Sequence, residues 1–189
     1  MSFESDPLAL RALAHPLRLR IRELLNRDGA LTSTELGREL GISQALASHH
    51  VRQLAKYGYV RAAPGADQRE RRWELVHASI SAETTEPGAE LDAVEQAYAQ
   101  RALARLREWQ ELRRDPDSGF DPSWLEHAGL SDNLLYLTAE EVAVLRSALG
   151  QAVAEYRGRT EDPASRPDGA RPVALFALIT PLSPTEHGN

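Results

Sequence analysis

The residues Thr32–Tyr59, TSTELGRELGISQALASHHVRQLAKYGY, predict two short helices joined by a tight turn. Thr32 and, three residues later, Glu35 form a capping box that starts the first helix. Gly41 ends that helix, because glycine accepts the left-handed conformation of a C-cap, and Ser43 caps the second one. The stretch therefore predicts a helix-turn-helix.

The second predicted helix turns an apolar side inward and a polar side outward. Leu46, Val51 and Leu54 are expected to face the core. Two amphipathic helices also fit an ordinary helical core, but the small and hydrogen-bonding side chains left outside suit the major groove of DNA. The candidate base-contacting residues are Ser43, Gln44, Ala45, Ser48, His49 and Arg52.

The next segment, Val60–Val76, predicts a β-hairpin. Apolar residues alternate in two short runs, and Pro64–Asp67 supplies the turn between them. Arginines gather on the returning side, where a wing would place them against phosphates; a solvated hairpin with unrelated arginines is the alternative. Joined to the helices, the hairpin predicts a winged helix. The candidate phosphate contacts are Arg18, Thr32, Ser33, Lys56, Arg69, Arg71 and Arg72.

The run Leu13–Leu25, LAHPLRLRIRELL, together with the motifs behind it, resembles the ArsR family of bacterial winged-helix transcriptional regulators. Leu13–Ala14, Pro16 and Leu17–Arg20 match the way in which that family opens its domain, and the likeness extends over about residues 8–77. The resemblance implies a homodimer that binds a double-stranded DNA operator, usually as a repressor, and that responds to a signal.

Thiolate metal sensing, which is common in that family, is excluded because the chain has no cysteine. His49 and His50 are adjacent on a predicted helix and point in different directions, and the other histidines have no helical partner four residues away. We therefore expect no metal site and no cofactor. A zinc site assembled across a dimer is the alternative that the sequence leaves open.

Charge is divided unevenly along the 189 residues. Residues 1–80 hold 12 Lys and Arg against 9 Asp and Glu, a net of +3, whereas the remainder holds 10 against 19, a net of −9. The positive part coincides with the predicted winged helix, so phosphate attraction would act in one orientation. No apolar run of about 18 residues and no signal-peptide pattern occurs, and we expect a cytoplasmic protein without membrane association.

Residues 81–114 predict a linker followed by a long helix, from Ala89 to about Arg114. Apolar residues recur along it every three or four positions. The expected partner is the same helix, or the N-terminal helix, of a second subunit, and packing within one subunit is the alternative. The expected dimer contacts are Leu91, Val94, Tyr98, Leu106 and Trp109.

Residues 115–189 predict a small α+β unit that serves dimerisation or binds an effector. Asn133–Leu137 and Pro172–Leu182 are expected to pair as strands, and Thr138 with Glu141 caps the helix between them. No glycine-rich phosphate loop or nucleophile motif occurs, so no enzyme is expected. Buried anchors ahead of the strands are expected at Phe120, Trp124 and Leu125.

The sequence thus predicts a mainly α fold with a β-hairpin wing: a winged helix-turn-helix domain at residues 1–80, a dimerisation helix and a small C-terminal region. The expected function is that of a sequence-specific DNA-binding transcriptional regulator, a homodimeric repressor of ArsR type. A winged helix that binds a protein is one alternative, which the polar outer side of the second helix disfavours. A small hydrophobic effector bound at the C-terminal region is another.

Overall fold

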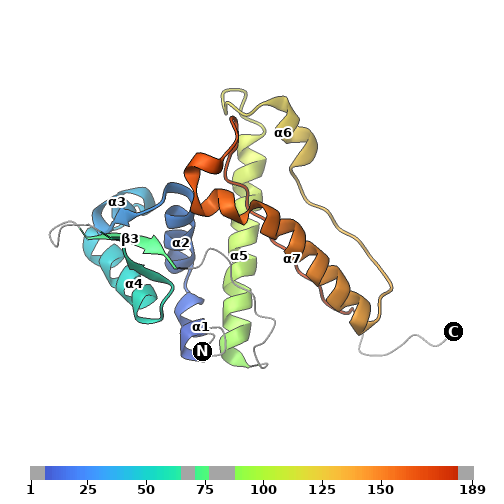
Figure 1. Ribbon diagram of the computed structural model, residues 1–189, viewed down its shortest axis with the longest axis horizontal. Helices are drawn as coiled ribbons and strands as arrows, with labels where there is room; N and C mark the ends of the chain where they lie inside the picture. The colour runs from blue at the N-terminus through green and yellow to red at the C-terminus, as the bar shows by residue number, and fades with distance from the viewer. Residues whose placement is uncertain (1–6, 65–70, 77–87, 183–189) are drawn as a thin grey trace. The chain divides into compact units, whose positions relative to one another are not determined.

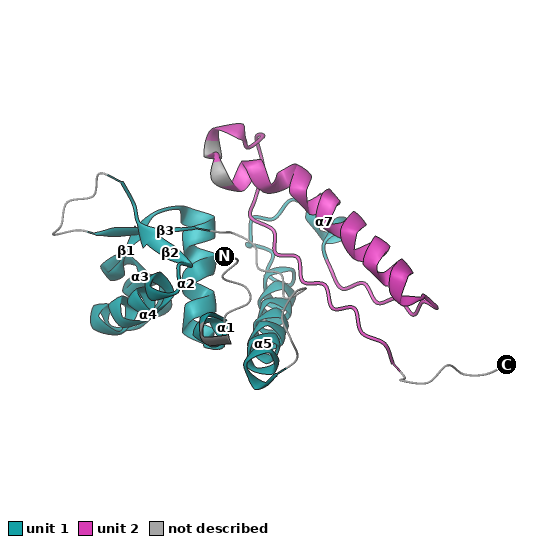
Figure 2. Cartoon of the chain, turned by 60° about the horizontal axis from the view of Figure 1, so that its bottom comes forward, with its two compact units in different colours: residues 1–128 teal, residues 129–189 magenta. Residues whose placement is uncertain are grey.

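The computed structural model describes residues 7–64, 71–76 and 88–182 (Figure 1). The chain divides into two compact units, residues 1–128 and 129–189, which Figure 2 colours separately. The first unit consists of α1 (Pro7–Leu13), α2 (Pro16–Asp28), β1 (Leu31–Thr32), α3 (Ser33–Leu40), α4 (Gln44–Lys56), β2 (Val60–Ala62), β3 (Arg72–Leu75), α5 (Ala89–Leu112) and α6 (Pro122–His127). The second contains α7 (Ala139–Glu161) and a short 3-10 helix, Pro163–Ser165.

The predicted helix-turn-helix is confirmed as α3 and α4. The Thr32 hydroxyl accepts a hydrogen bond from the Glu35 N–H at 3.1 Å, and the Glu35 carboxylate accepts one from the Thr32 N–H at 2.7 Å. Gly41 has a φ of 65° and a ψ of 32°, the left-handed conformation expected at the C-cap. The Ser43 hydroxyl then accepts from the Leu46 N–H at 3.2 Å and starts α4.

The predicted hairpin is confirmed as the antiparallel pair β2 and β3, in which Val60 lies opposite Leu75 and Ala62 opposite Trp73. A third strand, β1, pairs with the other edge of β3 and places Leu31 opposite Trp73. The sequence pattern did not predict β1, because a strand of two residues has no alternation to detect.

Helices α1 to α4 and the sheet share one hydrophobic core with α5. On α4 the buried side is centred on Ala47, Val51 and Leu54. The prediction that Leu46 faces inward is wrong: its side chain is 40% exposed. Leu46 precedes Ala47 by one residue, a rotation of about 100° in a helix of 3.6 residues per turn, and His50 is buried instead.

The long helix predicted from Ala89 is confirmed as α5, and it packs against α1 and α2 of its own chain. Val94, which was expected to contact a second subunit, is only 3% exposed because it packs in the core of its own chain. The Tyr98 hydroxyl accepts a hydrogen bond from Arg22 Nη1 at 2.9 Å, and Arg101 pairs with Glu23 at 2.8 Å. Apolar packing and these polar contacts join α5 to the winged helix.

An aromatic cluster holds α6 at the C-terminal end of α5. The rings of Trp109 and Phe120 meet edge to face with centroids 5.5 Å apart, and Phe120 lies 6.5 Å from Trp124. Phe120 and Trp124, expected to be buried, are half-buried, and the third expected anchor, Leu125, is exposed. It follows Trp124 by one residue and therefore points to a different side of α6.

The second unit contains the predicted helix but not the predicted strands. Thr138 and Glu141 form the expected capping box at the start of α7. Asn133–Leu137 and Pro172–Leu182 contain no strand, which corrects the α+β prediction for this region. Neither segment has a neighbouring backbone with which to form a ladder of hydrogen bonds, and Tyr136 is 94% exposed. The apolar sequence pattern of the two segments was therefore not sufficient to produce a sheet.

No helix among the described residues is both long enough and apolar enough to cross a membrane.

We expect Gly37→Ala to destabilise the first unit by about 1 kcal/mol, although alanine favours helices by a similar amount over glycine. A Cβ at Gly37 would lie 3.0 Å from the Ile42 carbonyl oxygen and 3.3 Å from the Gln44 nitrogen, both backbone atoms. Chemical denaturation measures the loss. Gly150→Ala on α7 is the control, because a Cβ there meets nothing within 4 Å. A more stable Gly37→Ala protein would contradict the prediction.

Candidate nucleic-acid interface

A concave site of about 470 Å³ opens where the first turn of α3, the outer side of α4 and strand β3 meet. Most of its lining is polar, and it contains seven of the thirteen residues predicted to contact DNA. The lining residues are Thr32, Ser33, Thr34, Glu35, Gln44, Ser48, Arg52, Arg71, Arg72 and Trp73.

Helix α4 contributes a row of three polar side chains to this site. Gln44, Ser48 and Arg52 follow one another at intervals of four residues and therefore lie on one side of the helix. Gln44 and Arg52 are exposed, and Ser48 is half-buried. The other predicted base-contacting residues do not line the site but are exposed at the same end of α4: Ser43, Ala45 and His49.

The wing contributes two arginines that behave differently: Arg72 is the first residue of β3, and Arg71 directly precedes it. The guanidinium group of Arg71 lies over the Trp73 ring, 5.6 Å from its centroid, and its side chain is exposed. Arg72 instead donates to the Ala30 carbonyl at 2.9 and 3.1 Å and pairs with Glu35 at 3.1 Å. Arg72 therefore lines the site while its guanidinium group joins β3 to the start of α3.

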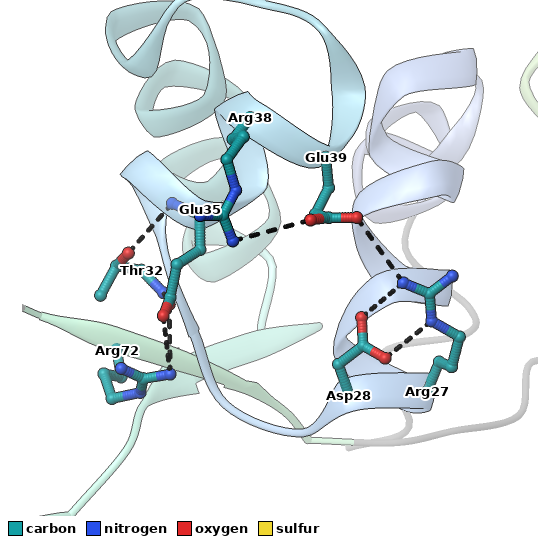
Figure 3. Close-up of polar contacts among 7 residues, drawn as sticks. All are labelled: Arg27, Asp28, Thr32, Glu35, Arg38, Glu39 and Arg72. Atoms are coloured by element: carbon teal, nitrogen blue, oxygen red, sulfur yellow. Dashed lines mark hydrogen bonds and ion pairs between the residues drawn. The ribbon is translucent and has the colours of Figure 1, made fainter.

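Glu35 places a carboxylate inside a site predicted to contact phosphates (Figure 3). The backbone N–H of Thr32 and the charge of Arg72 lower the pKa of this carboxyl group, so it is ionised near neutral pH. Its negative charge is offset locally by Arg72. No described carboxylate forms an ion pair with Arg52 or Arg71, so these two residues supply the positive charge of the site.

The remaining predicted phosphate contacts lie elsewhere. Arg18 borders a second hollow of about 240 Å³, together with Arg11 and Tyr57, and burial lowers the pKa of its guanidinium group. Lys56 lies in the last turn of α4, over the ring of Tyr57. Arg69 is outside the described residues.

Three histidines meet where α4 packs against the start of α2. The His15 Nδ1 atom accepts a hydrogen bond from the Leu17 N–H at 3.2 Å and thereby caps α2. Its ring lies 4.5 Å from that of His50, which lies 5.3 Å from that of His49. The contact between His15 and His50 has no signal in the sequence, because the two residues lie far apart in the chain.

Burial lowers the pKa of His50 to about 4 and also lowers that of His15. The nearby positive charge of Arg18 acts on both in the same direction. Both imidazoles are therefore neutral near pH 7. Within the described part of the chain, no group of three His, Asp or Glu side chains is arranged to hold a metal ion.

Residues 13–61 match a family described as a helix-turn-helix domain. The chain carries a helix-turn-helix domain. The matched range runs from the end of α1 into β2 and includes the whole row Gln44, Ser48 and Arg52. Domains of this class bind DNA through the second helix of the motif, which in this chain is α4.

Solved structures to which the chain shows similarity include a variant of ZitR from Lactococcus lactis, at 19% sequence identity over 74% of this chain and 73% of that chain, with a TM-score of 0.34. The adhesin competence repressor AdcR from Streptococcus pyogenes is 15% identical over 75% of this chain and 78% of that chain, with a TM-score of 0.32. No curated protein matches the chain significantly.

We expect acid to destabilise the first unit through His50, which is 6% exposed. Its folded pKa of about 4 lies below the unfolded value of 6.5, so unfolding takes up a proton between these values. This contribution to stability is complete above pH 6.5 and falls as the pH drops towards 4, by about 2 kcal/mol between pH 7 and pH 5. Denaturation midpoints at several pH values measure it.

The variant His50→Leu is expected to lose less than half as much stability between pH 7 and pH 5, because a leucine side chain has no group that takes up a proton. His49→Gln, on the exposed neighbour, should keep the full loss. An unchanged pH dependence in His50→Leu would show that another group is responsible.

Proposed function

We propose that this protein is a sequence-specific DNA-binding transcriptional regulator that acts as a homodimeric repressor of ArsR type. The observation that carries the proposal is the row Gln44, Ser48 and Arg52 on the outer side of α4, with Arg71 at the edge of the same site. Amide and guanidinium groups on one side of a helix suit the edges of bases in the major groove, where each base pair presents its own donors and acceptors.

Two kinds of contact are combined in this proposal. Gln44 and Arg52, on α4, contact base edges and determine sequence preference. Arg71, on the wing, contacts phosphates and contributes affinity without preference. The first turn of α3 adds backbone N–H groups at Ser33 and Thr34, which suit a phosphate oxygen. Arg72 supports the site by holding β3 against α3 rather than by contacting DNA.

The proposed dimer uses the part of α5 that its own chain leaves uncovered. Val94 and Ala97 face α1 and α2, whereas Leu103 is 56% exposed. Of the predicted dimer contacts, Leu91, Leu106 and Trp109 are each partly accessible. An apolar patch on a long helix favours a second copy, because two copies related by a two-fold axis bury the same patch on each other.

The ArsR assignment rests on the residues of the first three helices and on the wing, and repression is the usual mode in that family. Because the chain has no cysteine, the signal is not detected through thiolates. Binding of a small effector or of a partner that alters the dimer would change the spacing of the two α4 helices, and with it the affinity for the operator.

Substitutions should separate base contacts from phosphate contacts. Gln44→Ala or Arg52→Ala is expected to cost roughly 1–3 kcal/mol on the preferred operator and to relax base preference. Arg71→Ala is expected to weaken all sequences alike and to reduce the slope of log affinity against log salt by about one. Titrations of selected and scrambled DNA at several salt concentrations measure both effects.

Arg107→Ala is the matched control, because it removes the same charge from an exposed position on α5 that does not line the site. It should leave operator affinity unchanged. Altered base preference in Arg71→Ala, together with unchanged affinity and preference in Gln44→Ala, would reverse the roles assigned to the two elements.

The operator is expected to be palindromic. Two α4 helices related by a two-fold axis must enter major grooves on one face of the duplex, which sets the half-sites about 10 base pairs apart or a multiple of that. Selection of bound fragments from genomic DNA followed by footprinting would show the repeat. Protection of a single half-site by one protein chain per DNA would contradict the dimer.

A further inference from the structure

The second unit has no hydrophobic core of its own. None of the described residues from 129 to 182 is buried, whereas the first unit contains every residue of the core cluster. Large apolar side chains are nevertheless frequent in this unit, and fourteen of them are exposed. A segment of this size loses conformational entropy when it folds, and the free energy gained by burying apolar surface normally offsets that loss. Here little apolar surface is buried. The unit therefore needs a partner surface.

Helix α7 shows what kind of partner fits. Its apolar side consists of five residues whose spacing is symmetric about Leu149: Val142 and Tyr156 lie seven residues to either side, and Leu145 and Val153 lie four residues to either side. An antiparallel second copy of α7 would then place Leu149 against its own equivalent and each outer residue against its counterpart. A different protein would not require this symmetry.

Charge along α7 is arranged almost symmetrically about the same point: Glu141 lies eight residues before Leu149 and Arg159 lies ten residues after it. Glu141 and Arg159 are eighteen residues apart, which is five full turns, so both lie on the same flank of the apolar side. In an antiparallel pair the same flanks face each other, and Glu141 of each copy approaches Arg159 of the other. The flank thus carries opposite charges at its two ends, which is what self-association about a two-fold axis requires.

We propose that α7 pairs in antiparallel fashion with α7 of a second copy of this chain, with the two-fold axis at Leu149. Helix α7 would then be one contact surface of the homodimer proposed above. The inference rests on that proposal, because it assumes two chains per assembly. On this apolar side Leu149, Val153 and Tyr156 are exposed and Val142 and Leu145 are half-buried, so apolar surface remains there for a second copy to cover.

Cysteine cross-linking tests the pairing directly, because the chain contains no cysteine of its own. Leu149→Cys in the full-length protein places one thiol per chain at the two-fold axis, and oxidation or a short bis-maleimide should link two chains in high yield. Val144→Cys is the matched control, since Val144 lies on the other side of α7 and is 69% exposed. It should cross-link at least tenfold less.

Charge reversal supplies a second test, and because Glu141 also caps α7, circular dichroism checks that each variant keeps its helix content. In the Leu149→Cys background, Glu141→Arg or Arg159→Glu alone should lower the cross-linking yield severalfold, and the two together should restore it. Equal yields from Leu149→Cys and Val144→Cys, absence of cross-linking, or failure of the double reversal to rescue would each overturn the pairing.

Light scattering and operator binding, measured on the unmodified protein, keep this inference apart from the proposed function. A dimer that binds DNA but does not cross-link through Leu149→Cys would overturn the α7 pairing and leave the regulator proposal intact. Specific cross-linking by a protein that binds no DNA would do the reverse.

Discussion

The close approach of α3 to the turn before α4 is the constraint on which the candidate interface depends. Gly37 lets the backbone of α3 lie against the backbone at Ile42 and Gln44, and Gly41 makes the turn in a conformation that other residues rarely adopt. This packing determines the angle between the two helices. The angle in turn determines which side of α4 is buried and leaves Gln44 and its neighbours outside.

Polar contacts extend this arrangement to the wing and to α2. Arg72 joins β3 to the start of α3 and also offsets the charge of Glu35, so a carboxylate can cap a helix next to a surface suited to phosphates. At the other side of α4, the neutral rings of His15 and His50 fill the contact with α2. The helix-turn-helix is thus held by one charged contact, at α3, and by one contact between neutral rings, at α4.

The two units differ in how their apolar residues are satisfied. In the first unit α5 packs against α1 and α2. Ion pairs such as that of Arg101 with Glu23 restrict the orientation of α5 relative to α2. In the second unit the apolar side chains of α7 and of the extended segments around it remain accessible. The proposed homodimer would give a physical reason for this division, because an incomplete unit couples the stability of one chain to the presence of another.

The sequence alone determined the helix-turn-helix, the hairpin and the two long helices. Capping boxes at Thr32 and Thr138, the glycine at Gly41 and apolar periodicity are local signals, and they act through neighbouring residues. The predicted base contacts on α4 follow from the same periodicity, since the side of a helix that is not apolar must face outward.

Only the tertiary structure decided what depends on distant residues. It added β1, brought His15 against His50, and directed Arg72 towards Ala30 and Glu35 rather than outward. It also left the segments expected to be C-terminal strands without partners, because a strand requires a neighbouring backbone and a sequence pattern cannot supply one. Local patterns specify the elements of this protein, whereas contacts between residues far apart in the chain specify which side chains are free to act.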